Sequence, residues 1–541
     1  MMSACDIVLV NGKIVTVDPN DRIVEAVAIK TGRIVQVGSN QEIKRLIQSE
    51  TRVIDLAGKT VLPGFIDAHT HLLSTSTNLT YMVDIHTPPV KTVVDILKRI
   101  KAQADKTPKG EWIIGQGNFH LDRKLIDRRY PTKAELDKVA PNHPVVLRGG
   151  AHLQILNSNA LAQAEIRRDT PDPPGGKVDR NAVGEPTGIL REAYGALPIP
   201  PYTFDQIREA IKHTSQMIYV KRGITTIHEF LMSTTGMKIY QDLLNHDELP
   251  LRLNILVTIP TMVDVDCLVN LGIQTGFGNQ WLRISGVKLF VDGGITGVAA
   301  AIYRPYLHQQ HVGVLKTTQE KLTQRVIKAH KAGLRVCLHA VGDKAFDMAL
   351  NSLDAALKAK PMQDHRHRIE HAGNILCTLE RIERMKELGI IPVPTPPFLY
   401  SFGDYIETYL GQKRAKTVFV YKTLLNSGFM PPGNSDCAGA EPESINPLFG
   451  IWCAVTRKTF NGNILCLEEK ISVKEAIRMY TIYAAYAGFE EKLKGSIEPG
   501  KLADLIVLSH DILTVPVDTI KQIEIEMTII NGKIVYQRAS P

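Results

Sequence analysis

The chain has 541 residues, of which 44% are hydrophobic and 22% charged, and its formal net charge is +8. This composition is ordinary for a soluble globular protein, and the length suffices for a large domain with additional parts. The positive charges are dispersed, so the sequence predicts no nucleic-acid partner. It contains no apolar stretch of about 18 residues, no signal segment and no C-x-x-C pair among its seven cysteines. We therefore expect a cytoplasmic protein with reduced cysteines and no membrane segment.

The two ends of the chain resemble each other. Asn11-Gly12 and Asn531-Gly532 each stand between alternating apolar runs, and this is the strongest short signal for a β-hairpin. Further strand-like runs follow the first pair and precede the second. We expect residues 1–62 and 497–541 to form one small β-sandwich domain.

Strand-like runs alternate with helix-like stretches between the two ends, over residues 63–496. This alternation predicts an α/β fold, a (β/α)8 TIM barrel. The first and second strands are too far apart for one helix to connect them, which predicts an inserted subdomain at about residues 75–215, after barrel strand 1. The eight predicted barrel strands are residues 65–71, 225–230, 251–257, 284–293, 334–342, 367–372, 390–394 and 429–436.

A His-x-His pair lies in the first predicted barrel strand. Asp67, His69 and His71 alternate along it, so their side chains project from the same face. Two neutral imidazoles at this spacing can converge on one metal ion, and zinc is a typical choice. The pair alone is weak evidence, because a single histidine is more often a core residue.

Four further polar residues lie in or directly after other predicted barrel strands: Lys288, His339, His371 and Asp436. The carboxyl ends of barrel strands meet at one mouth, where the chemistry of such barrels is found. We therefore expect these residues to join the His-x-His pair around a divalent metal, most simply zinc.

Two of these residues have alternative interpretations. A protonated lysine is a poor metal ligand, so Lys288 is either a buried partner of Asp292 or another carboxylate, or a lysine carboxylated by carbon dioxide. Asp436 either caps the following helix or acts as a general base that takes a proton from a metal-bound water.

Six segments together resemble the amidohydrolase superfamily: residues 63–72, 285–293, 338–345, 368–373, 434–436 and 494–508. They look like its amidohydrolase family 3 branch, the YtcJ-like proteins, which includes N-substituted formamide deformylases. The resemblance covers essentially the whole chain.

The resemblance implies hydrolysis of a C–N bond, other than a peptide bond, in an amide, formamide, carbamate or cyclic amide. Metal-bound hydroxide would attack the carbonyl, with Asp436 as the general base and one or two divalent ions bound. The implied ligands are His69, His71, Lys288 as N6-carboxylysine, His339, His371 and Asp436.

The sequence departs from this family after the fourth predicted strand. Members commonly have Asp-Gly-Ser followed by an arginine, whereas residues 292–306 here read DGGITGVAAAIYRPY. Arg304 is a candidate substrate contact in this loop, and a solvated loop is the alternative. His152, in the insertion, is a candidate for lining the pocket or polarising the substrate carbonyl, and an ordinary loop histidine is the alternative.

Two other functions remain open at this point. A deaminase acting on nitrogen heterocycles would typically have a glutamate shortly after His339, whereas residues 340–343 here are Ala-Val-Gly-Asp. A non-catalytic scaffold would have lost metal ligands, and this chain keeps the full set. The expected partner is a small amide-like substrate, and the β-domain could pair two chains as a homodimer.

Overall fold

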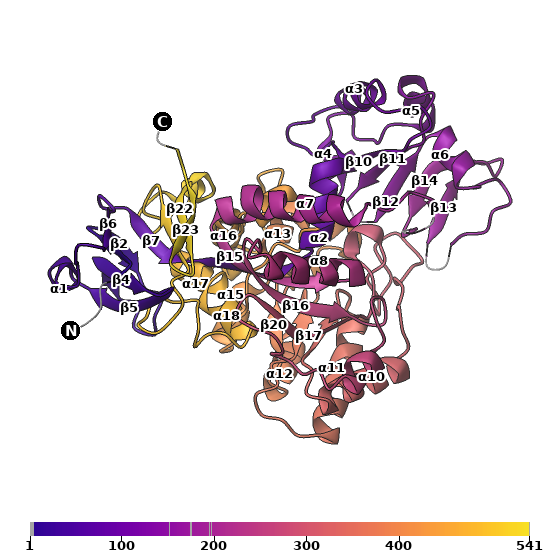
Figure 1. The fold of residues 1–541 in the computed structure, drawn as a ribbon. Coiled ribbons are helices and arrows are strands. Elements are labelled where there is room, and N and C mark those ends of the chain that lie inside the picture. The colour runs from indigo at the N-terminus through magenta and orange to yellow at the C-terminus, as the bar shows by residue number, and fades with distance from the viewer. Residues whose placement is uncertain (1–4, 151, 174–175, 194, 196, 540–541) are drawn as a thin grey trace.

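The structure is a computed structural model that describes residues 5–150, 152–173, 176–193, 195 and 197–539. A curled sheet surrounded by helices forms the middle of the molecule (Figure 1). Strands from the two ends of the chain, indigo and yellow, lie side by side on one flank, and a separate sheet drawn in purple lies on the other. None of the described helices is both long and apolar enough to cross a membrane.

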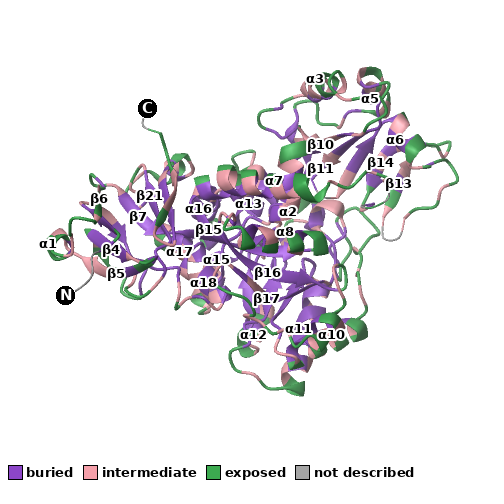
Figure 2. Cartoon of the chain, in the orientation of Figure 1, coloured by how far each residue is buried: buried purple, intermediate pink, exposed green. Residues whose placement is uncertain are grey.

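The central sheet has seven parallel strands in the order β20-β19-β18-β17-β16-β15-β8. Most of their residues are buried, as expected for parallel strands covered by helices (Figure 2). The α/β, TIM-like prediction is confirmed by this curled parallel sheet with its helical crossovers. Its strands are β8 (Phe65–Thr70), β15 (Ile224–Leu231), β16 (Arg252–Thr258), β17 (Leu282–Phe290), β18 (Val336–His339), β19 (Arg368–Glu370) and β20 (Ile391–Val393).

Helices connect these strands and cover the outside of the sheet. Five of them alternate with the strands from β15 to β20: α8 (Thr234–Asn245), α9 (Val265–Asn270), α10 (Gln319–Lys331), α11 (Asp343–Ala359) and α12 (Leu379–Glu387). After β20 the chain is largely helical, with α13 (Pro396–Phe402), α14 (Ile406–Leu410), α15 (Tyr421–Asn426), α16 (Pro447–Thr456), α17 (Val473–Met479) and α18 (Ile482–Ala487).

The predicted eighth strand, residues 429–436, is wrong, because this segment forms no β-ladder. Pro431 and Pro432 lack the N–H groups that a ladder needs. The segment still joins the two edges of the curled sheet. The Asp436 amide donates to the His69 carbonyl at 2.8 Å, and the Asn434 side chain donates to the Pro394 carbonyl at 2.7 Å.

Strands from both ends of the chain form two further sheets, ordered β5-β4-β1-β6 and β23-β22-β21-β7-β2-β3. β21 pairs antiparallel with β7, so the two termini share one sheet. One hydrophobic cluster includes Leu9 and Ile29 from the first sheet and Val61 and Leu505 from the second. The strands are β1 (Ile7–Val10), β2 (Lys13–Val15), β3 (Ile23–Val24), β4 (Ala26–Lys30), β5 (Arg33–Gly38), β6 (Arg52–Asp55), β7 (Thr60–Pro63), β21 (Leu505–Leu508), β22 (Ile525–Ile530) and β23 (Lys533–Gln537).

Only one of the two Asn-Gly pairs makes the expected hairpin. Asn531-Gly532 connects β22 and β23, which pair antiparallel. Asn11-Gly12 instead takes the chain from one sheet to the other, since β1 pairs with β4 and β6 while β2 pairs with β3 and β7. The Asn11-Gly12 pattern predicted a turn correctly, but β1 and β2 pair with other strands and not with each other.

The segment between β8 and β15 forms a sheet of its own, ordered β13-β14-β12-β11-β10-β9. Flanking it, α2 (Leu72–Tyr81) and α7 (Phe204–Thr214) pack on each other beside the central sheet. The strands are β9 (Val83–Asp84), β10 (Ile113–Gly117), β11 (Val145–Gly149), β12 (Leu153–Leu156), β13 (Lys177–Arg180) and β14 (Pro186–Arg191). The helices are α3 (Val93–Ala104), α4 (Leu121–Lys124), α5 (Lys133–Val139) and α6 (Ser158–Gln163).

A buried ion pair connects the terminal sheets to the central one. Arg252, at the start of β16, donates to Asp504 through Nε at 2.7 Å and Nη2 at 3.0 Å, and both side chains are almost fully buried. We expect Asp504→Ala to lower the free energy of unfolding by about 3–5 kcal/mol, because it leaves the Arg252 guanidinium buried without its carboxylate.

Urea unfolding followed by circular dichroism measures this loss of stability. The control is Asp518→Ala, which breaks the exposed ion pair between Asp518 and Lys458 and should cost less than about 1 kcal/mol. Equal losses in the two variants would contradict the expected role of Arg252–Asp504.

Candidate metal centre

Two histidines and one aspartate meet at the carboxyl end of β8. Oδ1 of Asp436 lies 3.2 Å from Nε2 of His69 and 3.3 Å from Nε2 of His71. Within the part of the chain that the structure describes, one candidate ligand atom from each of these residues lies within 4.8 Å of the others. Two imidazole nitrogens and a carboxylate oxygen are the donors that zinc and similar ions take.

His69 is oriented by an acidic residue from a distant strand. Its Nδ1 lies 2.8 Å from Oε2 of Glu370, and both side chains are buried. Arg368 donates to the same carboxylate at 2.8 and 2.9 Å, so Glu370 is ionised and Nδ1 of His69 is the donor. This tautomer leaves the lone pair of Nε2 directed toward Asp436.

His71 follows the last residue of β8 and stands at the N-terminus of α2. Glu229, buried on β15, accepts hydrogen bonds from the backbone amides of Leu72 and Leu73. A carboxylate at a helix N-terminus satisfies unpaired amides and favours the helix dipole. Glu229 therefore fixes the turn that presents His71.

His339 and His371 bring two more imidazoles to the same place. Nε2 of His371 lies 3.1 Å from Nδ1 of His339 and 3.8 Å from Oδ2 of Asp436. Burial lowers the pKa of both rings, that of His371 to about 4, so both are neutral. Nε2 of His339 and Nδ1 of His371 are buried without a hydrogen-bond partner among the described residues. Neutral imidazoles with unused nitrogens fit a divalent ion.

Lys288 projects from β17 into the same buried region. Its amine has no hydrogen-bond partner among the described residues and lies 4.2 Å from the ring centre of Phe230. Burial lowers the pKa of Lys288 to about 8, although the charges of Glu370 and Asp436 oppose the shift.

Asp292 is not the hydrogen-bond partner of Lys288 among the described residues, and the carboxylates whose charges act on the amine are Glu370 and Asp436. The Asp292 carboxylate accepts hydrogen bonds from three backbone amides, those of Ala301, Val341 and Gly342, at 2.8–3.0 Å. Through these hydrogen bonds the Asp292 carboxylate holds the loop after β17 against the end of β18.

The backbone is in the left-handed region at two of the clustered residues, with φ of 72° at His371 and 45° at Asp436. Non-glycine residues adopt it rarely, and such sites concentrate where function requires a special orientation. Burial alone would raise the pKa of Asp436, but His69, His71 and His371 outweigh it and hold this pKa well below its ordinary value. Asp436 is therefore a carboxylate.

Asp67 shares the strand with His69 and His71 but lies outside the cluster. Its carboxylate accepts from the backbone amide of Ser435 at 3.0 Å and from the Ser435 hydroxyl at 2.6 Å. Asp67 thus fixes the segment that carries Asp436.

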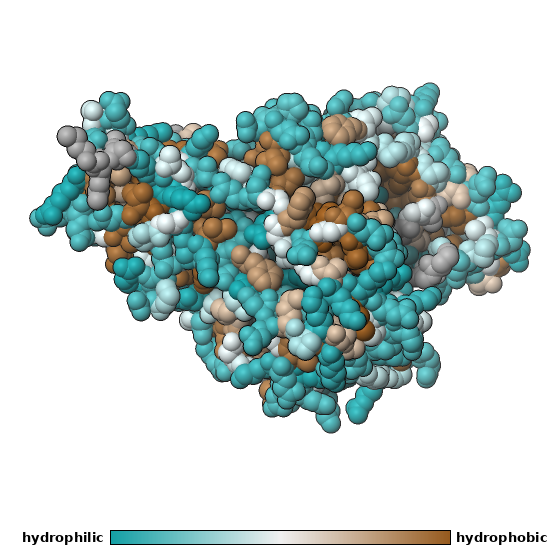
Figure 3. Space-filling view, turned by 60° about the horizontal axis from the view of Figure 1, so that its bottom comes forward, coloured by the Kyte–Doolittle hydropathy of each residue, from teal (hydrophilic) through white to brown (hydrophobic). Residues whose placement is uncertain are grey.

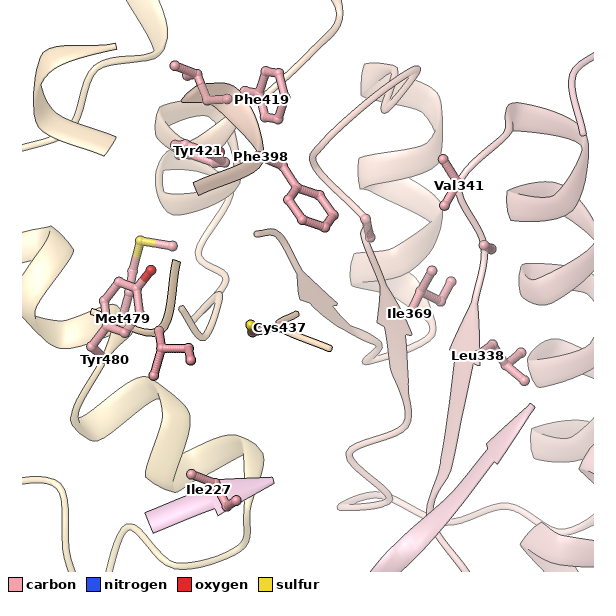
Figure 4. Packing of buried hydrophobic residues seen from close by; sticks show 14 of the residues in the cluster. Ile227, Leu338, Val341, Ile369, Phe398, Phe419, Tyr421, Cys437, Met479 and Tyr480 are labelled. Atoms are coloured by element: carbon pink, nitrogen blue, oxygen red, sulfur yellow. The ribbon is translucent and has the colours of Figure 1, made fainter. Parts of the chain in front are cut away.

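A cavity of about 70 Å³ opens onto His339, His371 and Asp436. Figure 4 shows Phe398 pointing from its helix toward the strands that carry Ile369 and Leu338, with Phe419 drawn above it. Four aromatic residues line the cavity and form what we call the aromatic wall: Phe119, Phe398, Phe402 and Phe419.

His152 lines the same cavity, with its Nδ1 2.8 Å from Oε1 of Glu192. Gly294 makes room for the ring, because a Cβ atom there would lie 2.6 Å from Nε2 of His152. This accounts for the glycine that replaces the expected serine. Arg304 is not brought to the cavity: its side chain is exposed, and its carbonyl accepts from Arg414.

The sequence reasoning missed Glu370, Glu229 and the aromatic wall. Arg368 and Glu370 alternate with His367 and Ile369 along one strand, and a charged pair inside a short strand is a signal that could have been followed. Phe398 and Phe402 are four residues apart on α13, a helical spacing that the sequence does show. Phe119 and Phe419 come from distant segments, and no comparable signal existed for them.

The family model described as the amidohydrolase family matches residues 52–536. The Bacillus subtilis protein YtcJ is 32% identical over 95% of this chain and 96% of its own length. The N-substituted formamide deformylase of Arthrobacter pascens is 30% identical over 98% of both chains. A metal-dependent hydrolase from Pyrococcus horikoshii has a similar structure, with a TM-score of 0.75 and 26% identity over 95% of this chain and 99% of that one.

The match of the family model spans most of the chain, and the relatives are similar over nearly their full lengths. The curled parallel sheet and the polar residues at its carboxyl end agree with these similarities. The chain belongs to the amidohydrolase family.

Proposed function

We propose that this protein is a metal-dependent hydrolase that cleaves the C–N bond of a small amide-like substrate. The observation that carries the proposal is the convergence of His69, His71 and Asp436 at the carboxyl end of a parallel sheet. The deformylase and metal-dependent hydrolase among the similar proteins support it. Formamides, other amides, carbamates and cyclic amides are the substrate classes to test.

His69, His71 and Asp436 would hold the ion, with His339, His371 and carboxylated Lys288 completing a site for one or two ions. When bound, a divalent ion lowers the pKa of water and polarises a carbonyl group. Asp436, kept ionised by its neighbours, accepts the proton of the attacking water and delivers it to the leaving nitrogen. His152, oriented by Glu192, donates to the substrate carbonyl, and the four phenylalanines exclude bulk water.

Carboxylation of Lys288 should depend on pH. The free amine adds to carbon dioxide, forming an N–C bond and releasing one proton. Because the pKa of Lys288 is lowered to about 8, the fraction of free amine rises steeply from pH 7 to pH 9. We expect labelled carbon dioxide to modify Lys288 in the metal-free protein to a greater extent at pH 9 than at pH 7.

Carbon-13 NMR of protein incubated with labelled bicarbonate measures this carbamate signal. The control is Lys288→Met, in which the signal should be absent. A signal of equal size at the two pH values, or one that persists in Lys288→Met, would contradict the assignment.

The proposed activity is tested by metal analysis together with a substrate screen. Purified protein should contain zinc or another divalent ion, and a chelator should abolish hydrolysis until the ion is returned. The screen uses N-formyl, N-acyl, lactam and carbamate compounds and measures the released amine and acid separately from ammonia. Release of ammonia from a heterocycle would indicate a deaminase, and protein without bound metal or any chelator effect would overturn the proposal.

A further inference from the structure

A second, much larger depression lies beside the metal centre, on the other side of the end of β17. It has a volume of about 1220 Å³ and is lined by the ends of β16 and β17 and the first turns of α10 and α11. Its apolar floor includes Ile259, Leu289 and Leu322. Hydrophilic side chains cover most of the surface in Figure 3, which brings the lower side of Figure 1 forward.

Among the residues that the structure describes, four cationic side chains and no carboxylate line this groove: Lys316, Lys321, Arg325 and Lys344. Within the described residues, none of these four side chains has an ion pair. An ordinary solvated helix face mixes charges of both signs, as Lys328 of α10 does by pairing with Asp266. Four unpaired cations around one depression repel each other, and a bound anion relieves that repulsion.

The groove is connected to the metal centre through β17. The backbone amide of Lys316 donates to the Val291 carbonyl at 2.8 Å, and Leu315 bridges to Asp292. The Phe290 ring centre lies 5.3 Å from the amine of Lys316 and 5.2 Å from the amine of Lys288. The centre of the Phe290 ring also lies 5.0 Å from the centre of the His339 ring. One phenylalanine therefore separates the cationic groove from the candidate reaction site.

We propose that the groove binds an anionic group, a carboxylate or a phosphate, on the substrate whose amide bond reaches the metal centre. This inference rests on the proposed function, and it narrows the substrate class to amides that carry an anion. Lys316 is nearest to the site through its contact with Phe290, and Arg325 offers the planar donor pair that carboxylate and phosphate accept. The first turn of α10 adds the positive end of a 13-residue helix.

Anion binding is tested by isothermal titration calorimetry of the metal-loaded protein with glutarate and, separately, inorganic phosphate. Lys316→Met and Arg325→Met should each weaken binding about tenfold, because each removes a charge-assisted contact. Lys331→Met is the matched control, since it removes an exposed cation from the far end of the same helix. The anion with the lower Kd, glutarate or phosphate, shows whether the group bound in the groove is a carboxylate or a phosphate.

Two outcomes would overturn the proposal. Unchanged affinity in both groove variants would assign anion binding to the metal centre alone. An equal loss in Lys331→Met would show that only the overall charge matters.

A kinetic comparison links the groove to the reaction. For an N-acyl amino acid and its neutral methyl ester, the ratio of the two kcat/KM values should fall about tenfold in Lys316→Met and stay constant in Lys331→Met. An unchanged ratio in Lys316→Met would contradict the proposal. If neither compound is hydrolysed, the proposed function fails for these substrates, while the calorimetry still decides whether the groove binds anions.

Discussion

Replacing Asp436 by asparagine is expected to lower kcat by a factor of about 10²–10⁴, the range lost when a general base is removed. Asparagine keeps the shape and one oxygen of the side chain but accepts no proton. The imidazoles of His69 and His71 lie 3.2 and 3.3 Å from the carboxylate, and with His371 they hold its pKa well below its ordinary value. The base is therefore ionised throughout the neutral range, and the variant loses it at every pH.

The measurement separates the two roles proposed for Asp436, as base and as ligand. Metal content and kcat are determined for Asp436→Asn at saturating substrate, with and without excess metal. Asp169→Asn, an exposed aspartate in the insertion, is the control and should behave as the unchanged protein. Full recovery of kcat in excess metal would show that Asp436 acts solely as a ligand, contrary to the prediction.

The residues around the metal centre differ in how far sequence alone could place them. His69 and His71 were predictable because the two-residue period of a strand fixes their common face. His339 and His371 were predictable because parallel strands bring their carboxyl ends to one edge. In each case a local pattern and one topological rule suffice, and these four side chains lie together in the structure.

Other parts of the fold depend on interactions that no local pattern records. Asn11-Gly12 predicts a turn, yet whether β1 and β2 pair depends on strands β4, β6 and β7, which compete for the same edges. Residues 429–436 occupy the position of an eighth strand, but Pro431 and Pro432 prevent a regular ladder there. Two backbone hydrogen bonds connect this segment to β8 instead: the Ala68 amide donates to the Gly433 carbonyl, and the Asp436 amide donates to the His69 carbonyl.

Glu370 shows why a supporting residue is harder to predict than a ligand. Its importance comes from two contacts made only after folding: one with His69, 301 residues away in sequence, and one with Arg368 on its own strand. Nothing in the sequence connects a glutamate on the sixth strand with a histidine on the first.

Glu370→Ala is therefore expected to impair metal binding and stability together. Without the acceptor at Nδ1, His69 loses its fixed tautomer, and metal affinity should fall about 10–100-fold, as for other partners of ligating histidines. The fully buried Arg368 loses the carboxylate that pairs with it, which should lower the free energy of unfolding by about 3–5 kcal/mol. Competition with a chromogenic chelator measures the first effect and urea unfolding the second.

Glu370→Gln separates these effects, because glutamine can still accept a hydrogen bond from His69 or Arg368 but carries no charge. It should retain more metal affinity than Glu370→Ala, while the buried guanidinium still lacks its counter-charge and stability remains reduced. Arg368 also donates to the Ala68 carbonyl at 2.7 Å and lies 2.9 Å from Nδ1 of His228, so part of its hydrogen bonding survives in both variants. Metal affinity equal to that of the unchanged protein in Glu370→Ala would mean that β8 and the 433–436 segment alone orient His69.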